Sequence, residues 1–354
     1  MFTTFAVLAL GVARPPTAQA HTAANSPASN YVSRITAVRP PSDNFTASVI
    51  EAGSRLQLRW RFGPDIVVLD YDGNPYLRIG SRGVEENLES NAVYLNRNRS
   101  GSSTLPDGLH PDGPPRWQRV STTPTARWHD HRIHWMLATL PPTVKGRTGT
   151  THLVQRWDVS IFQDTTKHTI RGDLRWVPGP SPLPFLLLAV ALGAGIVAFA
   201  LLRRRGATPV REPVRHTWMG IALIALVIVD ALHLFGIAFG IHGSIGSAMG
   251  RVLSVGFVSI IIWVVGAVAI VLLWQGRTDS LYLVTLCAAV ITFVGGLSDL
   301  AVLSRTSVPF AFGVGVARVC VAATLGLGVG LAAAGVLLTR PDRGPGSAPP
   351  AAPI

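Results

Sequence analysis

The sequence predicts a mixed fold, in which an extracytoplasmic all-β sandwich is followed by an α-helical transmembrane bundle of about five helices. From Leu183 to Leu338 the chain is almost continuously apolar, and only short polar loops interrupt it. Residues 26–180, in contrast, are rich in charged residues, Trp and His. Each apolar block is long enough to cross the hydrocarbon layer as a helix, which takes about 20 residues. We therefore expect an integral membrane protein that is embedded in a lipid bilayer.

The first residues have the pattern of an export signal. Residues 5–12 form a short apolar run, and Ala18-Gln19-Ala20 offers a small-x-small cleavage site before His21. We predict a signal peptide at residues 1–20 and a mature amino terminus at His21, with an uncleaved anchor as the alternative. Cys287 and Cys320 both fall inside apolar segments, so we expect the exported domain to be stabilised by packing and not by disulfides.

Residues 21–177 are predicted to form the exported sandwich. The apolar pattern there is short and alternating and is punctuated by turn residues, which is typical of a β-sandwich. The predicted strand segments are 55–62, 65–71, 75–79, 128–136, 152–161 and 169–177. A proline-rich linker at residues 178–184 is expected to hold the sandwich close to the membrane.

The apolar half predicts the topology. The predicted spans are residues 183–202, 217–239, 252–274, 281–303 and 310–338. Arginines cluster after the first span, at Arg203, Arg204, Arg205, Arg211 and Arg215. The positive-inside rule places these arginines in the cytoplasm and the preceding domain outside. We expect a multi-pass protein of the plasma membrane, with a disordered cytoplasmic tail at residues 339–354.

The fifth predicted span carries a stripe of small residues. Ala322, Gly326, Gly330 and Ala334 recur at four-residue spacing. Such a stripe lets another helix approach closely, so we interpret it as a helix-packing surface.

Polar residues inside the predicted spans are costly in lipid and usually face the interior of a bundle. They are Asp230, His233, Asp299 and Arg318. Asp230 and His233 are three residues apart and so face the same way on a helix, while Asp299 could pair with Arg318. These residues are expected to fix helix packing, to form a proton, ion or metal path in the outer leaflet, or to bind a partner.

The segment richest in chemistry is Trp128-His129-Asp130-His131-Arg132-Ile133-His134-Trp135-Met136. On a strand, His129 and His131 point to the same face, and their imidazoles could chelate one metal ion. Because two ligands do not complete a site, further candidate ligands are His21, His110, Asp130, His134, His152 and His168. Imidazole-rich sites suit copper or zinc.

The same segment has a second interpretation. A cluster of Trp, His, Arg and Asp can form a hydrogen-bonded and cation–π network that closes a sandwich without disulfides. In that case we expect Arg132 to stack on Trp128 or Trp135. The alternatives predict different partners for the imidazole rings: a metal ion in one case and protein groups in the other.

Composition narrows the function classes. The formal charge of +12 comes with arginines that are dispersed or beside the first span, where basic residues usually set orientation, so nucleic-acid binding is not expected. The chain has no Gly-x-Ser-x-Gly motif and no phosphate-cradling glycine loop, so we expect no enzymatic activity. The preference for Arg over Lys, with abundant Ala, Gly and Pro, is typical of a GC-rich genome such as an actinobacterium's.

Two resemblances can be stated on these residues. The order of an exported sandwich with an amino-terminal His and a bundle with intramembrane His and acidic residues resembles fused copper-resistance C-type and D-type proteins. That resemblance implies a copper ligand at His21. The segments Tyr76-Leu77-Arg78, Trp128–Met136 and Gly296–Leu300 are similar to those of a family of actinobacterial exported polytopic membrane proteins, a likeness that implies no particular activity.

Two functional hypotheses follow. The first is an envelope protein that binds a transition metal, copper in preference to zinc, in its outer domain. It would deliver the metal to the bundle or sense it there, with Asp230, His233 and His242 as the receiving groups. The second is a scaffold or assembly protein, whose outer sandwich binds another envelope protein and whose polar groups hold the structure together.

Overall fold

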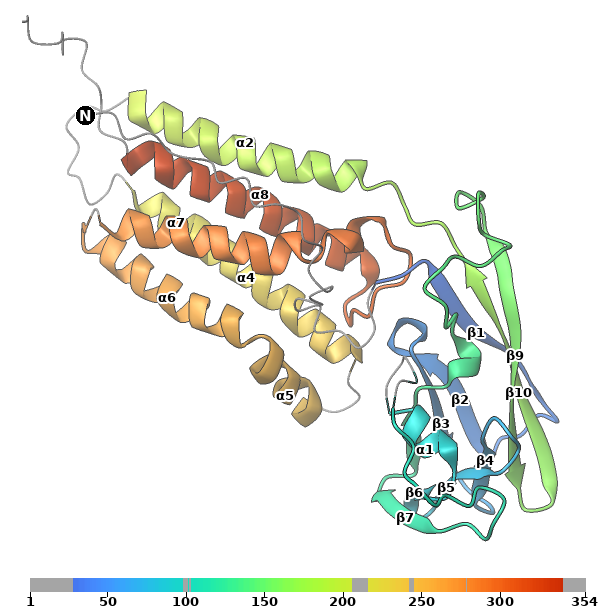
Figure 1. The fold of residues 1–354 in the computed structure, drawn as a ribbon. Helices are drawn as coiled ribbons and strands as arrows, with labels where there is room; N and C mark the ends of the chain where they lie inside the picture. Colours follow the sequence, from blue (N-terminus) through green and yellow to red (C-terminus); the bar gives the residue numbers. More distant parts are fainter. Residues whose placement is uncertain are drawn as a thin grey trace, which may run out of the picture.

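The computed structural model describes residues 28–97, 101, 103–205, 216–241, 245–277 and 279–339. An antiparallel β-sheet domain comes first and is followed by a helical bundle (Figure 1). The predicted signal peptide, His21, His242 and the predicted tail after Thr339 lie outside the described residues, as do Arg211 and Arg215.

The sheet domain contains two antiparallel sheets that share one hydrophobic core. The seven-stranded sheet has the order β1-β10-β9-β4-β5-β6-β7, and the three-stranded sheet has the order β2-β3-β8. Their bounds are β1 Tyr31–Arg39, β2 Phe45–Ile50, β3 Arg55–Trp60, β4 Ile66–Leu69, β5 Pro75–Gly80, β6 Gly83–Asn87, β7 Trp117–Ser121, β8 Thr125–Trp128, β9 His152–Gln163 and β10 Thr166–Trp176. Short helical segments are η1 Glu51–Gly53, α1 Asn91–Leu95 and η2 His131–Ile133.

Alternation along β3 shows how the sequence forms this core. Leu56 and Leu58 are fully buried, whereas Gln57 and Arg59 point away from the core. In the seven-stranded sheet, Ile161 of β9 and Ile170 of β10 are likewise fully buried. Because successive side chains of a strand point to opposite faces, this period of two buries one face of each sheet against the other.

The bundle contains five helices that are long and apolar enough to cross a membrane, counted over the described residues. They are α2 Leu183–Arg205, α4 Thr217–Ile241, α6 Phe257–Trp274, α7 Ser280–Ile291 with its π-helical continuation η3 Thr292–Leu297, and α8 Val314–Thr339. Two shorter segments complete the bundle: α5 Ile245–Val255 and η4 Leu300–Ser304. Large apolar side chains such as Leu187, Val190 and Val264 remain exposed on the helix surfaces, which suits contact with lipid.

The third predicted span is wrong at its start. We predicted one helix over residues 252–274, but the structure ends α5 at Val255 and begins α6 at Phe257. The break falls at Gly256, where a Cβ would lie 2.4 Å from a methyl carbon of Leu234 in α4. Close packing at this point therefore favours glycine, the residue with the lowest helix propensity apart from proline.

The small-residue stripe on α8 is a helix-packing surface, as predicted. A Cβ on Gly326 would lie 2.4 Å from the carbonyl oxygen of Ala189 in α2. A Cβ on Gly330 would lie 2.8 Å from the Cα of Gly193, also in α2. The absence of side chains on α8 thus lets the α2 backbone approach closely.

Short-range contacts connect the sheet domain to the bundle. Ser29, before β1, and Ser307, between η4 and α8, form a two-way backbone bridge. The backbone N–H of Thr306 donates to the side-chain oxygen of Asn30 at 3.1 Å, and the Thr306 hydroxyl donates to the Val177 carbonyl at 2.8 Å. The sheet domain is therefore held to the loop before α8 at both of its chain ends.

Candidate functional site

The histidine-rich segment does not form the predicted strand over residues 128–136. Strand β8 ends at Trp128, and the chain then turns into the 3₁₀ helix η2. The side chain of Asp130 accepts the backbone N–H of Arg132 at 3.1 Å and so caps this turn. Local side-chain hydrogen bonds of Asp compete with strand pairing, which explains why the strand stops here.

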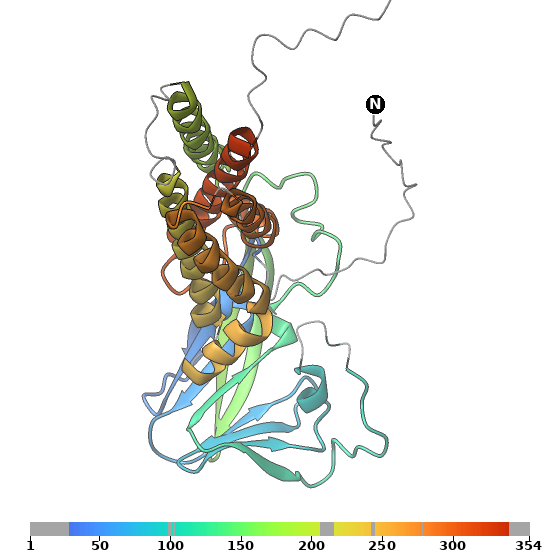
Figure 2. The same cartoon turned by 90° about the vertical axis from the view of Figure 1, so that its left-hand side faces the viewer.

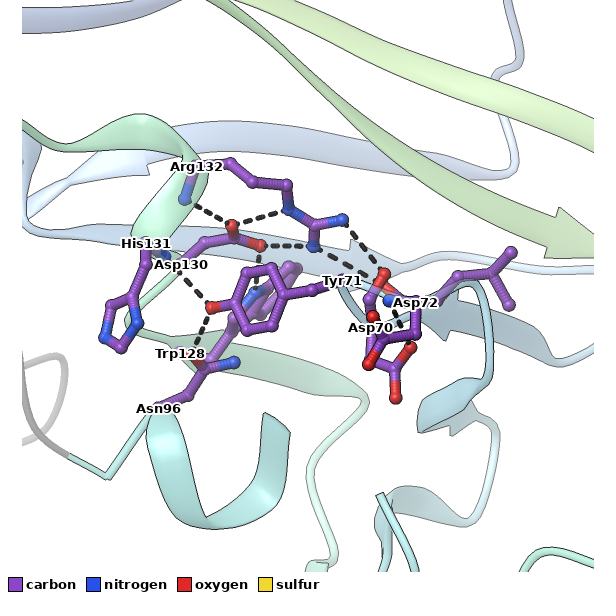
Figure 3. A network of polar contacts seen from close by, with 9 residues as sticks. Asp70, Tyr71, Asp72, Asn96, Trp128, Asp130, His131 and Arg132 are labelled. Atoms are coloured by element: carbon purple, nitrogen blue, oxygen red, sulfur yellow. Dashed lines mark hydrogen bonds and ion pairs between the residues drawn. The ribbon is translucent and has the colours of Figure 1, made fainter. Parts of the chain in front are cut away.

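Asp130 and Arg132 form a buried ion pair at the centre of this turn (Figure 3). The guanidinium donates through Nε to Oδ1 of Asp130 at 2.8 Å and through Nη2 to Oδ2 at 2.7 Å. The indole N–H of Trp128 also donates to Oδ2, at 2.9 Å. The carboxylate is completely buried, and these charge-assisted hydrogen bonds satisfy it.

The same guanidinium reaches the other sheet. Its Nη1 and Nη2 donate to the carbonyl oxygens of Asp70 and Leu69, at 3.2 Å and 3.3 Å, where β4 ends. The central carbon of the guanidinium also lies 4.9 Å from the ring centre of Tyr71, the residue after Asp70. We predicted stacking on Trp128 or Trp135, and the aromatic partner is Tyr71 instead. Arg132 thus links β8 of the small sheet to the end of β4 in the large one, through the network drawn in Figure 3.

Tyr71 and Asn96 complete this network. The Tyr71 hydroxyl donates to the side-chain oxygen of Asn96 and accepts the backbone N–H of His131 at 3.1 Å. The His131 ring stacks on the Tyr71 ring, with centroids 6.0 Å apart. Burial and the neighbouring Asp130 raise the pKa of Tyr71, so its hydroxyl stays protonated and can donate.

The pKa of Asp130 reflects two opposing effects. Burial alone would raise it, but the hydrogen bonds and the charge of Arg132, with the hydrogen bond from Trp128, hold it below its usual range. Asp130 is therefore a structural anion at neutral pH.

His129 has protein partners on both ring nitrogens. Its Nε2 accepts a hydrogen bond from Nε of Arg55 at 3.1 Å, and its Nδ1 lies 3.0 Å from the carbonyl oxygen of Ser54. Those partners require a neutral imidazole with its proton on Nδ1. The ring lone pair that a metal would need therefore faces a guanidinium.

The other candidate ligands lie against different groups. Nε2 of His134 is 2.9 Å from the same Ser54 carbonyl oxygen, and Nε2 of His152 is 2.8 Å from the Arg147 carbonyl oxygen. His131 stacks on Tyr71. Among the residues that the structure describes, no three His, Cys, Asp or Glu side chains form a group that could hold a metal ion. With His21 outside those residues, metal binding stays a prediction.

Asp230 and His233, both in α4, contact polar or charged groups outside their own helix. The indole N–H of Trp263 in α6 donates to Oδ2 of Asp230 in α4 at 2.8 Å. Nε2 of His233 lies 3.0 Å from Oδ2 of Asp299, just before η4. We predicted that Asp299 pairs with Arg318, but it pairs with His233 instead. The guanidinium of Arg318 donates instead to the Arg305 carbonyl oxygen, at 2.7 Å.

Sequence reasoning missed a basic surface on the three-stranded sheet. The outward side chains of β3 and β8 include Arg55, Arg59 and Arg127, and Arg61 follows at the end of β3. Gln57 of β3 lies opposite Arg127 of β8, so Arg55 and Arg59, two positions to either side of Gln57, are the diagonal neighbours of Arg127. These four arginines are termed the arginine face. Within the described residues, the salt bridges of this face involve only Arg55 and Glu51, whose nearest charged atoms are 3.5 Å apart.

A groove of about 640 Å³ lies at one end of the arginine face. It is lined by Thr46, Arg59, Trp60, Arg61 and Pro124. The exposed ring of Phe62 follows Arg61 in the chain. Arg, Trp and other aromatic residues are the types enriched where proteins bind one another. The alternation Arg55-Leu56-Gln57-Leu58-Arg59 could have revealed half of this face, but Arg127 joins it only through strand pairing.

These features define a multi-pass membrane protein with an antiparallel sheet domain at its amino-terminal side. Comparisons of the chain with protein-family models, with curated proteins and with solved structures find no match.

Proposed function

We propose that this chain is an envelope scaffold of the plasma membrane, whose extracytoplasmic sheet domain binds an acidic segment of another envelope protein. The arginine face carries the proposal. It brings four cations together on one face of the domain, and two of them, Arg59 and Arg61, line a groove. The neighbouring carboxylate of Glu51 is buried. A surface with this charge selects an acidic partner and speeds its approach.

The position of the basic residues beside the first span supports this function. Arg203 and Arg204 lie at the end of α2 that is remote from the sheet domain, which precedes α2 in the chain. Basic residues beside a span favour the cytoplasmic side. We infer that the sheet domain and its arginine face are extracytoplasmic, where other envelope proteins are accessible.

The way the sheet domain is attached fits a scaffold. Ser307 donates its hydroxyl to the Ala52 carbonyl oxygen at 2.9 Å, so the loop before α8 also contacts η1, which leads directly into β3. Burial raises the pKa of Glu51 in η1, and the charges of Arg55, Arg127 and Arg251 partly offset this effect. Since Arg251 belongs to α5, the membrane-proximal end of the arginine face is coupled electrostatically to the bundle.

The partner is tested by site-specific photo-cross-linking in intact cells. A benzophenone amino acid replaces Thr46, which is exposed beside the groove, or Lys167, which is exposed on the other sheet. We expect a discrete adduct with one protein at Thr46 and at most a trace of it at Lys167. Equal adducts at both positions, or none at either, would refute the proposal.

The metal hypothesis is tested separately on the purified full chain. Copper and zinc are counted per chain in the wild type and in a His129→Ala/His131→Ala variant. The scaffold proposal expects the two proteins to have the same low metal content. Stoichiometric copper or zinc that the double variant loses would favour metal handling instead, because His129 would then have exchanged Arg55 for the metal.

A further inference from the structure

The loop between η2 and β9 carries apolar side chains that the sheet domain leaves uncovered. Leu137 is 63% exposed, and Met136 and Leu140 are exposed as well. The loop is nevertheless folded. Its Val144 is fully buried, and the indole N–H of Trp135 donates to the Thr139 carbonyl oxygen at 2.6 Å. A structured loop that exposes several large apolar side chains marks a binding surface.

The base of this loop lies at the membrane side of the sheet domain. The indole N–H of Trp176, the last residue of β10, donates to the Thr148 carbonyl oxygen at 3.0 Å. Val177 comes next and accepts a hydrogen bond from Thr306 of the bundle. The first span begins at Leu183, so the loop is anchored a few residues from where the chain enters the bundle.

The loop lies past the sheet-domain end of the helices and to one side of the bundle (Figure 1 and Figure 2). Figure 1 shows it in green at the end of the sheet domain that faces the helices. In Figure 2 it is a green trace at the side of the helices. A bilayer that surrounds the apolar helices would have its outer surface at this position.

The charge of this loop also fits contact with a bilayer. No Asp or Glu occurs between His131 and Trp157, and the loop contains Lys145 and Arg147. Both basic side chains are exposed. Apolar side chains that enter the headgroup region, together with nearby cations, are the combination that binds a bilayer containing anionic lipids.

We propose that the loop Trp135–Thr150 is a membrane-contacting loop, in which Met136, Leu137 and Leu140 enter the outer headgroup region of an anionic bilayer. The loop gives the sheet domain a second attachment to the membrane beside the linker. This contact depends on the bundle being embedded in a bilayer, and it is independent of the partner proposed for the arginine face.

The test uses the full chain in nanodiscs that contain phosphatidylglycerol and phosphatidylcholine, with one chain per disc. A polarity-sensitive fluorophore is attached at Leu137→Cys, and lipids that carry a spin label near the headgroup quench it. The matched control is Val120→Cys. Val120 is a comparably exposed apolar residue, at 51%, in β7 of the same domain (Figure 1). The unsubstituted chain measures background labelling, which we expect to be low because Cys287 and Cys320 are buried.

We expect quenching at position 137 that is several-fold stronger than at position 120. It should weaken when Lys145 and Arg147 are replaced by glutamate, or when phosphatidylcholine is the only lipid. Equal quenching at the two positions would overturn the proposal. So would a blue-shifted emission at position 137 that the labelled lipids do not quench, since this would indicate contact with protein.

Discussion

Ser29 and Ser307 exchange both of their backbone hydrogen bonds, each at 2.9 Å from nitrogen to oxygen, although 277 positions separate them in the chain. The first residue lies before the first strand of the sheet domain, and the second lies in the loop that leads into the last helix. This bridge closes the chain on itself, so that the sheet domain is attached to the bundle through more than its linker.

The bridge predicts that cysteines introduced at positions 29 and 307 will form a disulfide. Residues that exchange both hydrogen bonds in an antiparallel bridge have Cα atoms about 5.5 Å apart, within the range that a disulfide spans. We expect a Ser29→Cys/Ser307→Cys chain to form this disulfide on mild oxidation with diamide, as shown by mass mapping and by loss of maleimide labelling. In a Ser29→Cys/Ser160→Cys control both thiols should stay reactive, because Ser160 pairs with Thr169 at the far end of β10. Reactive thiols in the first variant would show that the bridge does not form.

Removing Arg132 should destabilise the sheet domain strongly. Arg132→Met leaves the carboxylate of Asp130 buried without its cation, which costs about 3–5 kcal/mol. The free energy of unfolding is measured by urea titration, with tryptophan fluorescence as the signal. In an Asp130→Asn/Arg132→Met double variant the loss should be smaller than the sum of the two single losses. The control is Arg171→Met, whose pair with Asp158 is exposed and spans 3.9 Å, so it should change stability by less than about 1 kcal/mol. Equal losses in Arg132→Met and Arg171→Met would contradict a structural role for Arg132.

Acid should destabilise the sheet domain through Asp130. Its pKa is lowered in the folded state, so the stability it contributes is complete above the unfolded pKa of about 3.9 and is lost as the pH falls further. We expect the contribution of Asp130 to the free energy of unfolding, measured as wild type minus Asp130→Asn, to be flat from about pH 5 to 7 and to decline below about pH 4. Asp130→Asn should therefore make the acid decline of the total free energy of unfolding shallower. Part of the decline should remain in this variant, because Arg34 and Arg175 lower the pKa of Asp173, which therefore also loses its stabilising effect in acid. An unchanged acid decline in Asp130→Asn would refute this account.

The contact of Asp230 with η3 requires a glycine. A Cβ on Gly295 would lie 2.1 Å from Oδ1 of Asp230, so Gly295→Ala must displace this carboxylate, which also accepts the Trp263 indole N–H, or the backbone of η3. We expect a loss of about 1–3 kcal/mol, typical of overpacking. Thermal unfolding in detergent can be followed with a thiol-reactive dye, since Cys287 and Cys320 are buried until the bundle opens. Gly315→Ala in α8 is the control, because an added Cβ there has no atom within 4 Å. The same unfolding temperature for both variants would show that the close contact is absent.

The sequence patterns that repeat with a fixed period were the most informative. Apolar blocks predicted the helices, and alternating residues predicted β3, β4, β5, β9 and β10, because burial imposes these periods directly. The small-residue stripe on α8 likewise predicted a packing surface, since close approach of helices requires small side chains.

Contacts between distant segments could not be predicted in the same way. The strand expected over residues 128–136 gave way to a turn, since Asp130 binds Arg132 and Arg132 binds the end of β4. The partner of Asp299 depends on how far each helix is rotated about its axis, which hydropathy does not specify. The arginine face depends on the register that places Arg127 beside Gln57.

The central claim, that the arginine face binds an acidic partner, is tested most directly by reversing its charge. The chain with the photo-cross-linker at Thr46 is compared with the same chain carrying Arg59→Glu and Arg127→Glu, and with a chain carrying Arg171→Glu on the other sheet. All three must first show equal amounts of folded protein in the membrane. The claim predicts that the adduct is lost in the double variant and retained with Arg171→Glu. An adduct of equal yield in all three chains would contradict it.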